Sequence, residues 1–469
     1  MNSSITLRTE DARFQPAEYF GERMPLIKID NVELEVKGGT TVLEAADIAG
    51  IEIPRYCYHP GLSIVASCRM CLVEVKGMPK LVTSCSTRIY EVREDRKIDG
   101  KYDMVVFTDS DKVVKARKGV LEFLLINHPL DCPVCDQAGE CYLQDYSYKY
   151  GGAHSRFRED KRENPRKELG PEVIYYPNRC ILCTRCIRFC SEIVGTQELI
   201  IRNRGYYSII DIYDEKPVAN KLSGNVNDLC PVGALVSRDF LHKTRVWNLK
   251  ATESICPGCG SGCNIYVYTK NGRVYRIKPR FNPEVNNYWI CDEGRLGYHA
   301  IDDVERLQSP LIKKGDKFES ISWEGAYRII VEKFSRLRKQ HGRNVIGGIG
   351  STCASNEENF IFRKLVAEVI GTPDNIGLYP SIYPGDPVIF KSGFRIEPDK
   401  VPNRTGALDM LGVSTDSIFD KIKRRKLKAL YFLHGCFNSS LPKENREILK
   451  KLDFLLVQDV YLSPVAQLA

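Results

Sequence analysis

The stretch Arg179-Cys-Ile-Leu-Cys-Thr-Arg-Cys-Ile-Arg188 places three cysteines at intervals of three residues, namely Cys180, Cys183 and Cys186. Thiolates are soft ligands that select zinc, copper(I) or iron–sulfur clusters. A tight loop with this spacing presents three thiolates to three corners of a cubane, a geometry that a tetrahedral zinc ion does not need. The stretch therefore indicates a [4Fe–4S] site and, with it, a ferredoxin-like domain.

Two later cysteines compete for the fourth position at this site. In two-cluster bacterial ferredoxins the fourth cysteine of such a run precedes a proline and binds the other cluster. Here Cys190 is followed by serine, and the Cys-Pro pair is Cys230-Pro231. We assign Cys230 as the fourth ligand of this third set, and we expect Cys190 to be a small buried residue.

A first set of cysteines lies nearer the N-terminus, at Cys57, Cys68, Cys71 and Cys85. The close Cys68/Cys71 pair can clamp one metal while the distant pair closes the site. Plant-type [2Fe–2S] ferredoxins use a C-x4-C-x2-C…C arrangement on a small β-rich domain. The first gap here is ten residues, which departs from that spacing. A zinc ion is the alternative occupant.

A second set combines one imidazole with three thiolates, at His128, Cys132, Cys135 and Cys141. The apolar pattern over residues 114–127 predicts a helix that delivers His128 to this set. By spacing alone, zinc and a cubane cluster fit the set equally well. A plain histidine at a helix end is the other interpretation of His128.

A fourth set follows at Cys256, Cys259, Cys263 and Cys291. Glycines at 258, 260 and 262 let the backbone fold tightly around a cluster. A four-cysteine zinc site is the alternative here as well.

The cysteine count agrees with four sites. The chain has 469 residues and 18 cysteines, and fifteen of them together with one histidine supply the sixteen ligands that four sites need. Cys190, Cys353 and Cys436 remain over. Zinc cannot change its redox state, whereas iron–sulfur potentials span a wide range. A series of such sites therefore indicates a path for electrons.

The composition excludes several classes of protein. An apolar fraction of 43% excludes disorder. The sequence lacks a run of about 18 apolar residues, so it predicts no membrane span. Residues 1–23 read as an extension without a secretory signal, which favours a reducing compartment. The net charge is only +8, so we interpret the basic run at 421–428 as a solvated helix face or subunit contact and expect no nucleic-acid partner.

Beyond about residue 305 the pattern becomes α/β. Apolar runs at 345–349, 429–433 and 454–457 predict strands, and residues 356–370 and 443–452 predict helices. Alternating strands and helices favour a parallel sheet. The glycine turn at 347–351 is interpreted as strand–helix geometry, with phosphate binding as the alternative. Near the N-terminus, residues 26–30 and 32–36 predict two strands, followed by a short helix over 41–48.

The order of the four sets, the motif from His128 to Cys141 and the stretch from Arg179 to Arg188 closely resemble the large iron–sulfur subunit family of NADH:quinone oxidoreductase. The resemblance extends over nearly the whole chain from about residue 24. It implies one [2Fe–2S] cluster in the first set and one [4Fe–4S] cluster in each of the other three, with His128 as a histidine ligand. The fourth cluster would lie off the main path.

The resemblance also implies partners and a place in the cell. Electrons would arrive from a flavin-bearing NADH-binding subunit and leave to a ferredoxin-like subunit that leads to quinone. The chain would belong to the H⁺-translocating NADH:quinone oxidoreductase without an active site of its own. It would lie in the peripheral arm, on the cytoplasmic side of the bacterial inner membrane, with no direct membrane insertion.

The C-terminal part resembles molybdopterin oxidoreductases such as formate dehydrogenase. The alternative function is therefore the electron-transfer subunit of an NAD-linked formate dehydrogenase or hydrogenase, and a structural zinc-binding module is the alternative from another class. In those molybdoenzymes the last cluster cysteine begins the motif Cys-x-Lys-Gly, whereas here Glu293 occupies the place of the lysine. Those enzymes also supply a cysteine to the metal from a later loop, and the matching stretch here, residues 375–384, contains no cysteine. We therefore expect no molybdopterin. The chain stops at Ala469, where relatives of both kinds continue, so a fragment and a shortened subunit are both open.

The expected fold class is α+β and multidomain, with the following order: an N-terminal extension (1–23), a β-grasp [2Fe–2S] ferredoxin-like domain (24–102), a His/Cys [4Fe–4S] segment (103–150), a [4Fe–4S] ferredoxin-like domain (151–248), a Cys-rich [4Fe–4S] domain of molybdopterin oxidoreductase type (249–305) and a truncated molybdopterin-oxidoreductase-like α/β domain (306–469).

Overall fold

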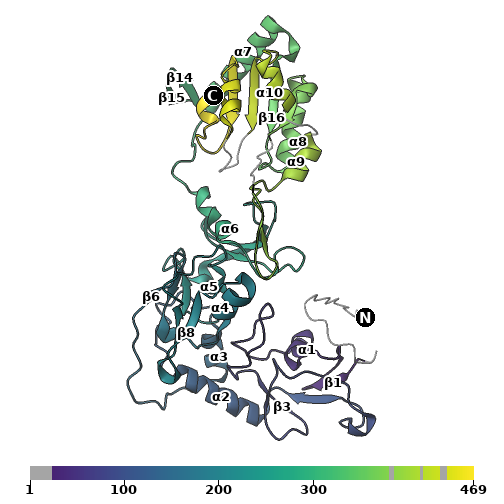
Figure 1. Ribbon diagram of the computed structural model, residues 1–469, viewed down its shortest axis with the longest axis vertical. Coiled ribbons are helices and arrows are strands. Elements are labelled where there is room, and N and C mark those ends of the chain that lie inside the picture. The colour runs from purple at the N-terminus through teal and green to yellow at the C-terminus, as the bar shows by residue number, and fades with distance from the viewer. Residues whose placement is uncertain (1–23, 380–384, 412–415, 434–440) are drawn as a thin grey trace. The chain divides into compact units, whose positions relative to one another are not determined.

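The computed structural model describes residues 24–379, 385–411, 416–433 and 441–469 (Figure 1). The predicted extension at 1–23, together with His434 and Cys436, lies outside the described residues. The chain divides into two compact units. The first contains the residues up to 129 and Tyr142–Arg162, and the second contains Leu130–Cys141 and Glu163–Ala469.

The first unit is built on a five-stranded sheet with the order β2-β1-β5-β3-β4. The strands are β1 (Leu26–Ile29), β2 (Val32–Glu35), β3 (Leu72–Val75), β4 (Val82–Thr83) and β5 (Met104–Phe107). β1 and β2 form the predicted hairpin, in which Asp30 adopts a left-handed φ of 51° at the turn. β5 pairs parallel to β1, so the sheet is mixed, as a ferredoxin-like β-grasp domain requires.

Three helices accompany this sheet, namely α1 (Val42–Ile48), α2 (Asp111–Leu125) and α3 (Tyr142–Tyr150). α1 begins at a capping box in which Thr41 and Glu44 satisfy each other's backbone N–H groups. Its buried face joins the strands in one apolar core that also contains Cys71 and Cys85. The first set of cysteines is therefore anchored in the best-packed part of this unit.

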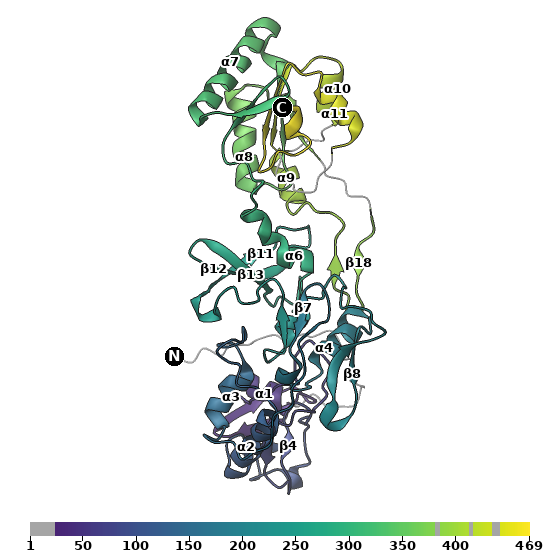
Figure 2. The same cartoon turned by 90° about the vertical axis from the view of Figure 1, so that its left-hand side faces the viewer.

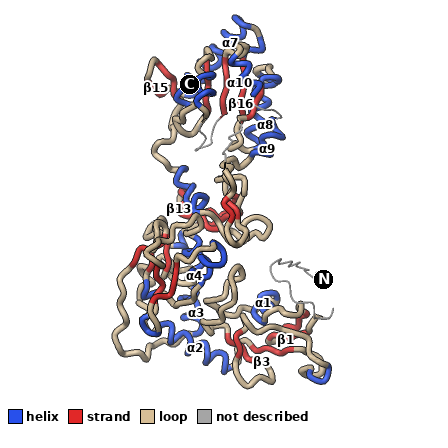
Figure 3. Tube along the Cα trace, viewed as in Figure 1, coloured by secondary structure: helices blue, strands red, loops and turns tan. Residues whose placement is uncertain are grey.

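The N-terminal part of the second unit contains short elements separated by long loops (Figure 3). Two small sheets have the orders β10-β7-β6 and β8-β9. The elements are β6 (Lys167–Glu168), β7 (Val173–Tyr175), α4 (Arg185–Arg188), β8 (Leu199–Arg202), β9 (Ile209–Ile212), α5 (Asn225–Leu229) and β10 (Leu235–Ser237). Because loops carry most of the cysteines, their side chains can converge from several directions.

A three-stranded antiparallel sheet, β11-β12-β13, follows near the predicted boundary at 248. Its elements are β11 (Lys250–Ile255), β12 (Asn264–Lys270) and β13 (Arg273–Pro279), and the short helix α6 (Asp292–Leu296) comes after it. The hairpin β14–β15 (Leu311–Lys314 and Lys317–Ser320) then leads to the α/β part of the unit.

The α/β part contains a four-stranded sheet with the order β17-β16-β20-β21, and all its pairings are parallel as predicted. The strands are β16 (Ile346–Gly350), β17 (Ile376–Leu378), β20 (Ala429–Leu433) and β21 (Phe454–Gln458). The helices are α7 (Trp323–His341), α8 (Asn356–Lys364), α9 (Arg404–Leu411), α10 (Asp416–Lys423) and α11 (Lys443–Leu449). One core lies between the sheet and α7, α8 and α9, and a second core packs α10 and α11 against it.

The glycines predicted to form a turn at 347–351 instead lie mainly within strand β16. A Cβ on Gly348 would meet Phe362 at 2.9 Å, and a Cβ on Gly350 would meet Leu411 at 2.2 Å. The glycines therefore allow α8 and α9 to approach the sheet closely. The predicted helix over 356–370 is α-helical only to Lys364 and continues as a π-helical turn to Val369.

A hairpin of β18 (Val388–Ile389) and β19 (Arg395–Ile396) extends from the α/β part to the ferredoxin-like part of the same unit (Figure 2). Lys391 Nζ donates to the carbonyl of Ser191 at 2.9 Å, and the N–H of Ser392 donates to the carbonyl of Ile193 at 3.1 Å. Within the described part of the chain, no helix has the length and apolarity needed to cross a membrane.

Candidate metal centres

The third set converges on one cavity. One cavity is lined by all four of Cys180, Cys183, Cys186 and Cys230, and its remaining walls are largely apolar. Loop 180–186 encloses it because Leu182 and Thr184 adopt left-handed φ angles of 51° and 61°. Four thiols that line one cavity are the donor set that a cubane needs.

Backbone N–H groups point at the sulfurs of this set. The N–H of Leu182 donates to Cys180 Sγ at 3.4 Å. Burial raises the pKa of the Cys230 thiol to about 11, although backbone N–H groups of the segment after it lower that pKa. Burial also raises the pKa of Cys183 to about 11. Binding of a metal group by these buried thiols therefore releases protons, and N–H···S bonds are one means of tuning a cluster potential.

Cys190 is a small buried residue, as expected, and its exclusion from the ligands stays a prediction. Its side chain is fully buried in the π-helical turn that follows α4, and it does not line the cavity. Burial raises the pKa of its thiol to about 12, so the thiol is neutral at physiological pH. The carbonyl of Cys190 accepts the N–H groups of Gly195 and Thr196, which ends the helical segment.

The first set is arranged as two pairs. Cys71 immediately precedes β3 and Cys85 closely follows β4, so the antiparallel pairing of these strands brings the two sulfurs to 3.4 Å. The other pair is Cys57 and Cys68, whose thiols are hydrogen-bonded. This pairing differs from the sequence expectation that Cys68 and Cys71 clamp one metal. Two pairs of thiols suit two neighbouring irons, which is the [2Fe–2S] arrangement.

Each pair of the first set already favours one thiolate. The hydrogen bond from Cys68 lowers the pKa of Cys57 to about 5, and the hydrogen bond from Cys85 lowers the pKa of Cys71 to about 6. The pKa values of Cys68 and Cys85 are correspondingly raised. Because the thiolate is the metal-binding form, the folded chain holds two of these ligands ready.

The second set is divided between the two compact units. His128 follows the end of α2 in the first unit, and Lys161 Nζ donates to its carbonyl oxygen at 2.8 Å. Cys132, Cys135 and Cys141 belong to the second unit, in which Cys132 is exposed and the other two are buried. Burial raises the pKa of the Cys135 thiol. The association of His128 with the three thiols stays a prediction.

Within the second unit, the second and third sets are neighbours. Gly233, three residues after Cys230, packs so closely on Cys135 that a Cβ on it would lie 2.1 Å from the sulfur. Arg179, which precedes Cys180, donates from Nε to Asp131 at 2.8 Å, and its Nη1 donates to the carbonyl of Gly233 at 3.4 Å. The backbones of the two sets are therefore held together by direct contacts.

The fourth set is organised by the β11–β12 turn and by α6. Cys256 and Cys263 flank this turn, where the N–H of Cys256 donates to the carbonyl of Cys263 at 2.8 Å. Cys291 caps α6, and its Sγ accepts the N–H of Gly294 at 3.3 Å. A Cβ on Gly294 would lie 2.9 Å from Cys256 Sγ and 3.4 Å from Cys291 Sγ, so the two sulfurs face the same glycine.

Burial also dominates the electrostatics of this set. It raises the pKa of Cys256 to about 11 and that of Cys263 to about 12. A cation comes from a distant part of the sequence, because Lys400 Nζ donates to Glu293 at 2.5 Å. Glu293, two residues after Cys291, is therefore paired with a cation that lies more than one hundred residues away in the sequence.

No group of three or more His, Cys, Asp or Glu side chains among the described residues is arranged to hold a single metal ion. The cysteines of the third set line one cavity, those of the first set form two pairs, and Cys256 and Cys291 of the fourth set both lie against Gly294. Sequence reasoning missed the close approach of Gly233 to Cys135 and the ion pair between Lys400 and Glu293. The sequence shows that Gly233 follows the Cys230-Pro231 pair, but it does not show that Gly233 packs against Cys135.

Family models match the chain in five consecutive segments. They are described as "2Fe-2S iron-sulfur cluster binding domain" (residues 23–94), "NADH-ubiquinone oxidoreductase-G iron-sulfur binding region" (117–156), "NADH-quinone oxidoreductase subunit 3, ferredoxin-like domain" (170–236), "Molybdopterin oxidoreductase Fe4S4 domain" (249–303) and "Molybdopterin oxidoreductase" (306–395). The predicted order of domain types is confirmed, while the domain boundaries stay predictions.

Curated relatives are similar over most of this chain. The NADH-ubiquinone oxidoreductase 75 kDa subunit of Reclinomonas americana is 42% identical over 72% of this chain and 47% of its own length. The mitochondrial NADH dehydrogenase (ubiquinone) iron-sulfur protein 1 of Solanum tuberosum is 41% identical over 75% of this chain and 46% of its own length. The chain thus spans about half the length of these relatives. A solved NAD⁺-reducing [NiFe]-hydrogenase structure is 28% identical over 48% of this chain and 92% of its own, with a TM-score of 0.39.

The fold and the four sets define an iron–sulfur protein with 2Fe–2S and 4Fe–4S binding domains ahead of a molybdopterin-oxidoreductase-type region. Two thiols of the first set lie 3.4 Å apart, and the four thiols of the third set line one cavity. The chain belongs to the family of the 75 kDa iron–sulfur subunit of NADH:quinone oxidoreductase.

Proposed function

We propose that the four sets hold one [2Fe–2S] and three [4Fe–4S] clusters. The two thiol pairs of the first set support the binuclear cluster. The cavity lined by Cys180, Cys183, Cys186 and Cys230 supports a cubane in the third set. The common contact of Cys256 and Cys291 with Gly294 supports a cubane in the fourth. For the second set the proposal rests on His128 and three thiols within fourteen residues of sequence.

We further propose that the chain relays electrons from NADH oxidation toward quinone as a subunit of NADH:quinone oxidoreductase. Iron–sulfur clusters supply one-electron redox chemistry when bound. The observation that carries the proposal is the contact of Gly233 with Cys135, because it brings the segment bearing Cys230 against the sulfur of another set. The chain's own residues hold the sites close, bury the sulfurs and direct N–H groups at them.

The partners in this proposal are a flavin-bearing NADH-binding subunit and ferredoxin-like subunits of the same complex. The place of the chain would be the peripheral arm of that complex, on the cytoplasmic side of the bacterial inner membrane. Molybdopterin is left out of the proposal because Glu293 stands in the place of the lysine that molybdoenzymes put between cluster and pterin.

The test is low-temperature EPR of the reduced protein together with iron and zinc analysis. The proposal expects four cluster signals and about fourteen irons per chain, counted from the cluster types. Stoichiometric zinc without iron would contradict it. Molybdenum or tungsten in the preparation would favour the formate dehydrogenase alternative instead.

A matched pair of variants tests the ligand assignment in the third set. Cys230→Ser should abolish the signal of this set, because its sulfur lines the cavity. Cys190→Ser should retain the signal, because that fully buried thiol lies outside the cavity wall. Loss of the signal in Cys190→Ser with retention in Cys230→Ser would reverse the assignment.

A further inference from the structure

A chain of charged side chains runs through the second unit from Glu140 to Arg295. Arg276 forms a two-pronged ion pair with Glu140, at 2.8 Å and 2.9 Å. Lys278 Nζ lies 3.2 Å from Glu140 and 3.9 Å from Asp228. Arg295 Nη2 lies 2.6 Å from the other oxygen of Asp228. We call these five residues the charge chain.

The two acidic members are close in sequence to cysteines of the second and third sets, and the backbone of Arg295 contacts a cysteine of the fourth. Glu140 directly precedes Cys141 of the second set, and Asp228 stands two residues before Cys230 of the third. Arg295 lies on α6, where its N–H donates to the carbonyl of Cys291 in the fourth set at 2.9 Å. The two basic residues from β13, Arg276 and Lys278, connect the second set to the third.

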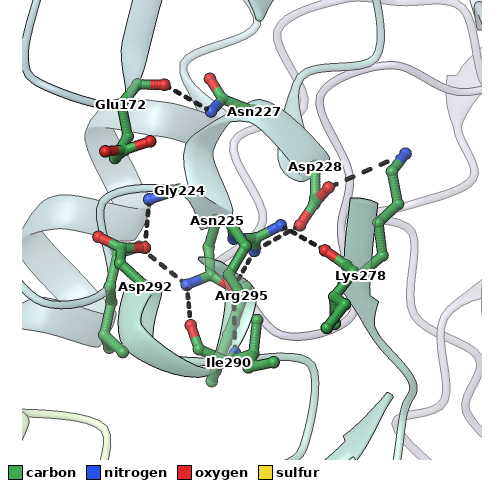
Figure 4. Close-up of polar contacts among 12 residues, drawn as sticks. Glu172, Gly224, Asn225, Asn227, Asp228, Lys278, Ile290, Asp292 and Arg295 are labelled. Carbon is green, nitrogen blue, oxygen red and sulfur yellow. Dashed lines mark hydrogen bonds and ion pairs between the residues drawn. The ribbon is translucent and has the colours of Figure 1, made fainter. Parts of the chain in front are cut away.

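Hydrogen bonds connect the segments of the third and fourth sets at their junction (Figure 4). Asn225 Nδ2 donates to the carbonyl of Ile290 at 2.7 Å, and the N–H of Ile290 donates back to Asn225 Oδ1 at 3.2 Å. Asp292 accepts from Ser223 Oγ at 2.6 Å and from the N–H of Gly224 at 2.8 Å. The segment before Cys230 and the segment around Cys291 are therefore joined by four hydrogen bonds.

The charge chain is mostly removed from solvent, with its five side chains between 9% and 24% exposed. Arg276 and Arg295 are buried, and their Nε atoms have no hydrogen-bond partner among the described residues. Charges in such surroundings are screened much less than exposed ones, so their fields reach neighbouring groups. All five residues also line one pocket of the second unit.

We propose that the charge chain is a positioning and electrostatic element that couples the second, third and fourth sets, so that one charge sets the reduction potentials of two neighbouring clusters. The inference rests on the proposed function, since a potential exists only where a cluster is bound. Reduction adds negative charge to a cluster, so a nearby cation raises its potential and a nearby anion lowers it.

The test uses EPR-monitored redox titration of the full chain in its purified complex. Arg295→Met should lower the potentials of the third and fourth clusters, and Lys278→Met should lower those of the second and third. Asp228→Asn should raise the potential of the third. Arg295→Lys retains the charge and should restore the potentials lost in Arg295→Met.

The matched control is Arg273→Met on the same strand β13. Its side chain is 70% exposed and pairs with Asp302 at 3.3 Å, away from the charge chain. This variant removes the same charge and should shift no potential. Opposite shifts for the acidic and basic substitutions support the proposal, because a purely structural role would not give a sign that follows the charge.

Unchanged potentials in Arg295→Met, Lys278→Met and Asp228→Asn, with normal iron content, would overturn the proposal. So would shifts of one common sign. If Arg295→Met does not fold, the decision falls to Lys278→Met and Asp228→Asn, whose side chains are less buried. A wild-type protein without iron would be a failure of the proposed function, and iron analysis distinguishes that result from a folded, iron-loaded protein whose potentials do not move.

Discussion

Gly233 packs against the sulfur of Cys135, and a Cβ at position 233 would lie 2.1 Å from that atom. Gly233 belongs to the segment that bears Cys230, whereas Cys135 belongs to the second set. One backbone segment thus touches a sulfur of one set and carries a ligand of the next. Only glycine allows this approach, because any side chain would displace the sulfur.

Gly233→Ala should impair the second set more than any other. The added methyl group must push aside Cys135, and overpacking of this kind costs roughly 1–3 kcal/mol. We expect a lower free energy of unfolding and a loss or broadening of the EPR signal of the second set. Gly297→Ala is the control, because a Cβ there would meet nothing within 4 Å. Equal spectra for the two variants would contradict the prediction.

Gly294→Ala should act on the fourth set alone. Its Cβ would lie 2.9 Å from Cys256 Sγ and 3.4 Å from Cys291 Sγ, so the two sulfurs could not keep their positions. We expect about four irons fewer per chain, counted from one [4Fe–4S] cluster, and an unchanged [2Fe–2S] signal. Iron analysis and EPR measure this, and a full iron count would show that Gly294 does not border the cluster.

His128→Cys should keep a cubane in the second set and lower its potential. A thiolate adds negative charge where the neutral imidazole has none, and this disfavours reduction. Redox titration of the signal of the second set is the measurement. His154→Cys, at an exposed position of the same unit, is the control and should shift nothing. An unshifted potential in His128→Cys would remove His128 from the ligands.

Asp211 should contribute to the pH dependence of stability. Burial raises the pKa of this carboxyl, but hydrogen bonds from Lys167 at 2.8 Å and Arg202 at 2.9 Å outweigh burial and hold the pKa below its ordinary value of 3.8. A carboxyl with a lowered folded pKa contributes stability that is present above the unfolded pKa and is lost as the pH falls through the folded one.

Asp211→Asn should therefore be less stable than the wild type near neutral pH, with a difference that shrinks below about pH 4. Thermal unfolding across this range measures the effect. Asp214→Asn is the control, because Asp214 is an exposed residue of the same region whose pair with Lys216 is on the surface. A difference that grows toward acid pH would have the wrong sign for this mechanism.

The local elements were largely predictable. Strands β20 and β21, the hairpin of β1 and β2 and the short helix α1 all follow from apolar periodicity and turn residues. The parallel sheet followed from the alternation of strands and helices. The prediction of one regular helix over 356–370 was wrong for its last part, which is a π-helical turn. Such a turn keeps nearly the same side-chain pattern as an α-helix and differs mainly in its hydrogen bonds.

Pairing within the sites was less predictable. Cys68 and Cys71 are neighbours in sequence, yet Cys71 lies against Cys85 because β3 and β4 pair in antiparallel register. Lys400 lies more than one hundred residues from Glu293 and still forms its ion pair. The spacing of residues along the sequence predicts neither contact.

The sequence by itself determined which soft ligands this protein groups together, because thiols at short intervals lie on the same loop and can reach the same metal group. It also determined the order of domain types, which the family models confirm. Only the tertiary structure decided which thiols are paired, where Gly233 touches Cys135 and how Glu140, Asp228 and Arg295 form one charge chain. These relationships depend on distances between segments remote in sequence, and such distances are set by the packing of the whole unit.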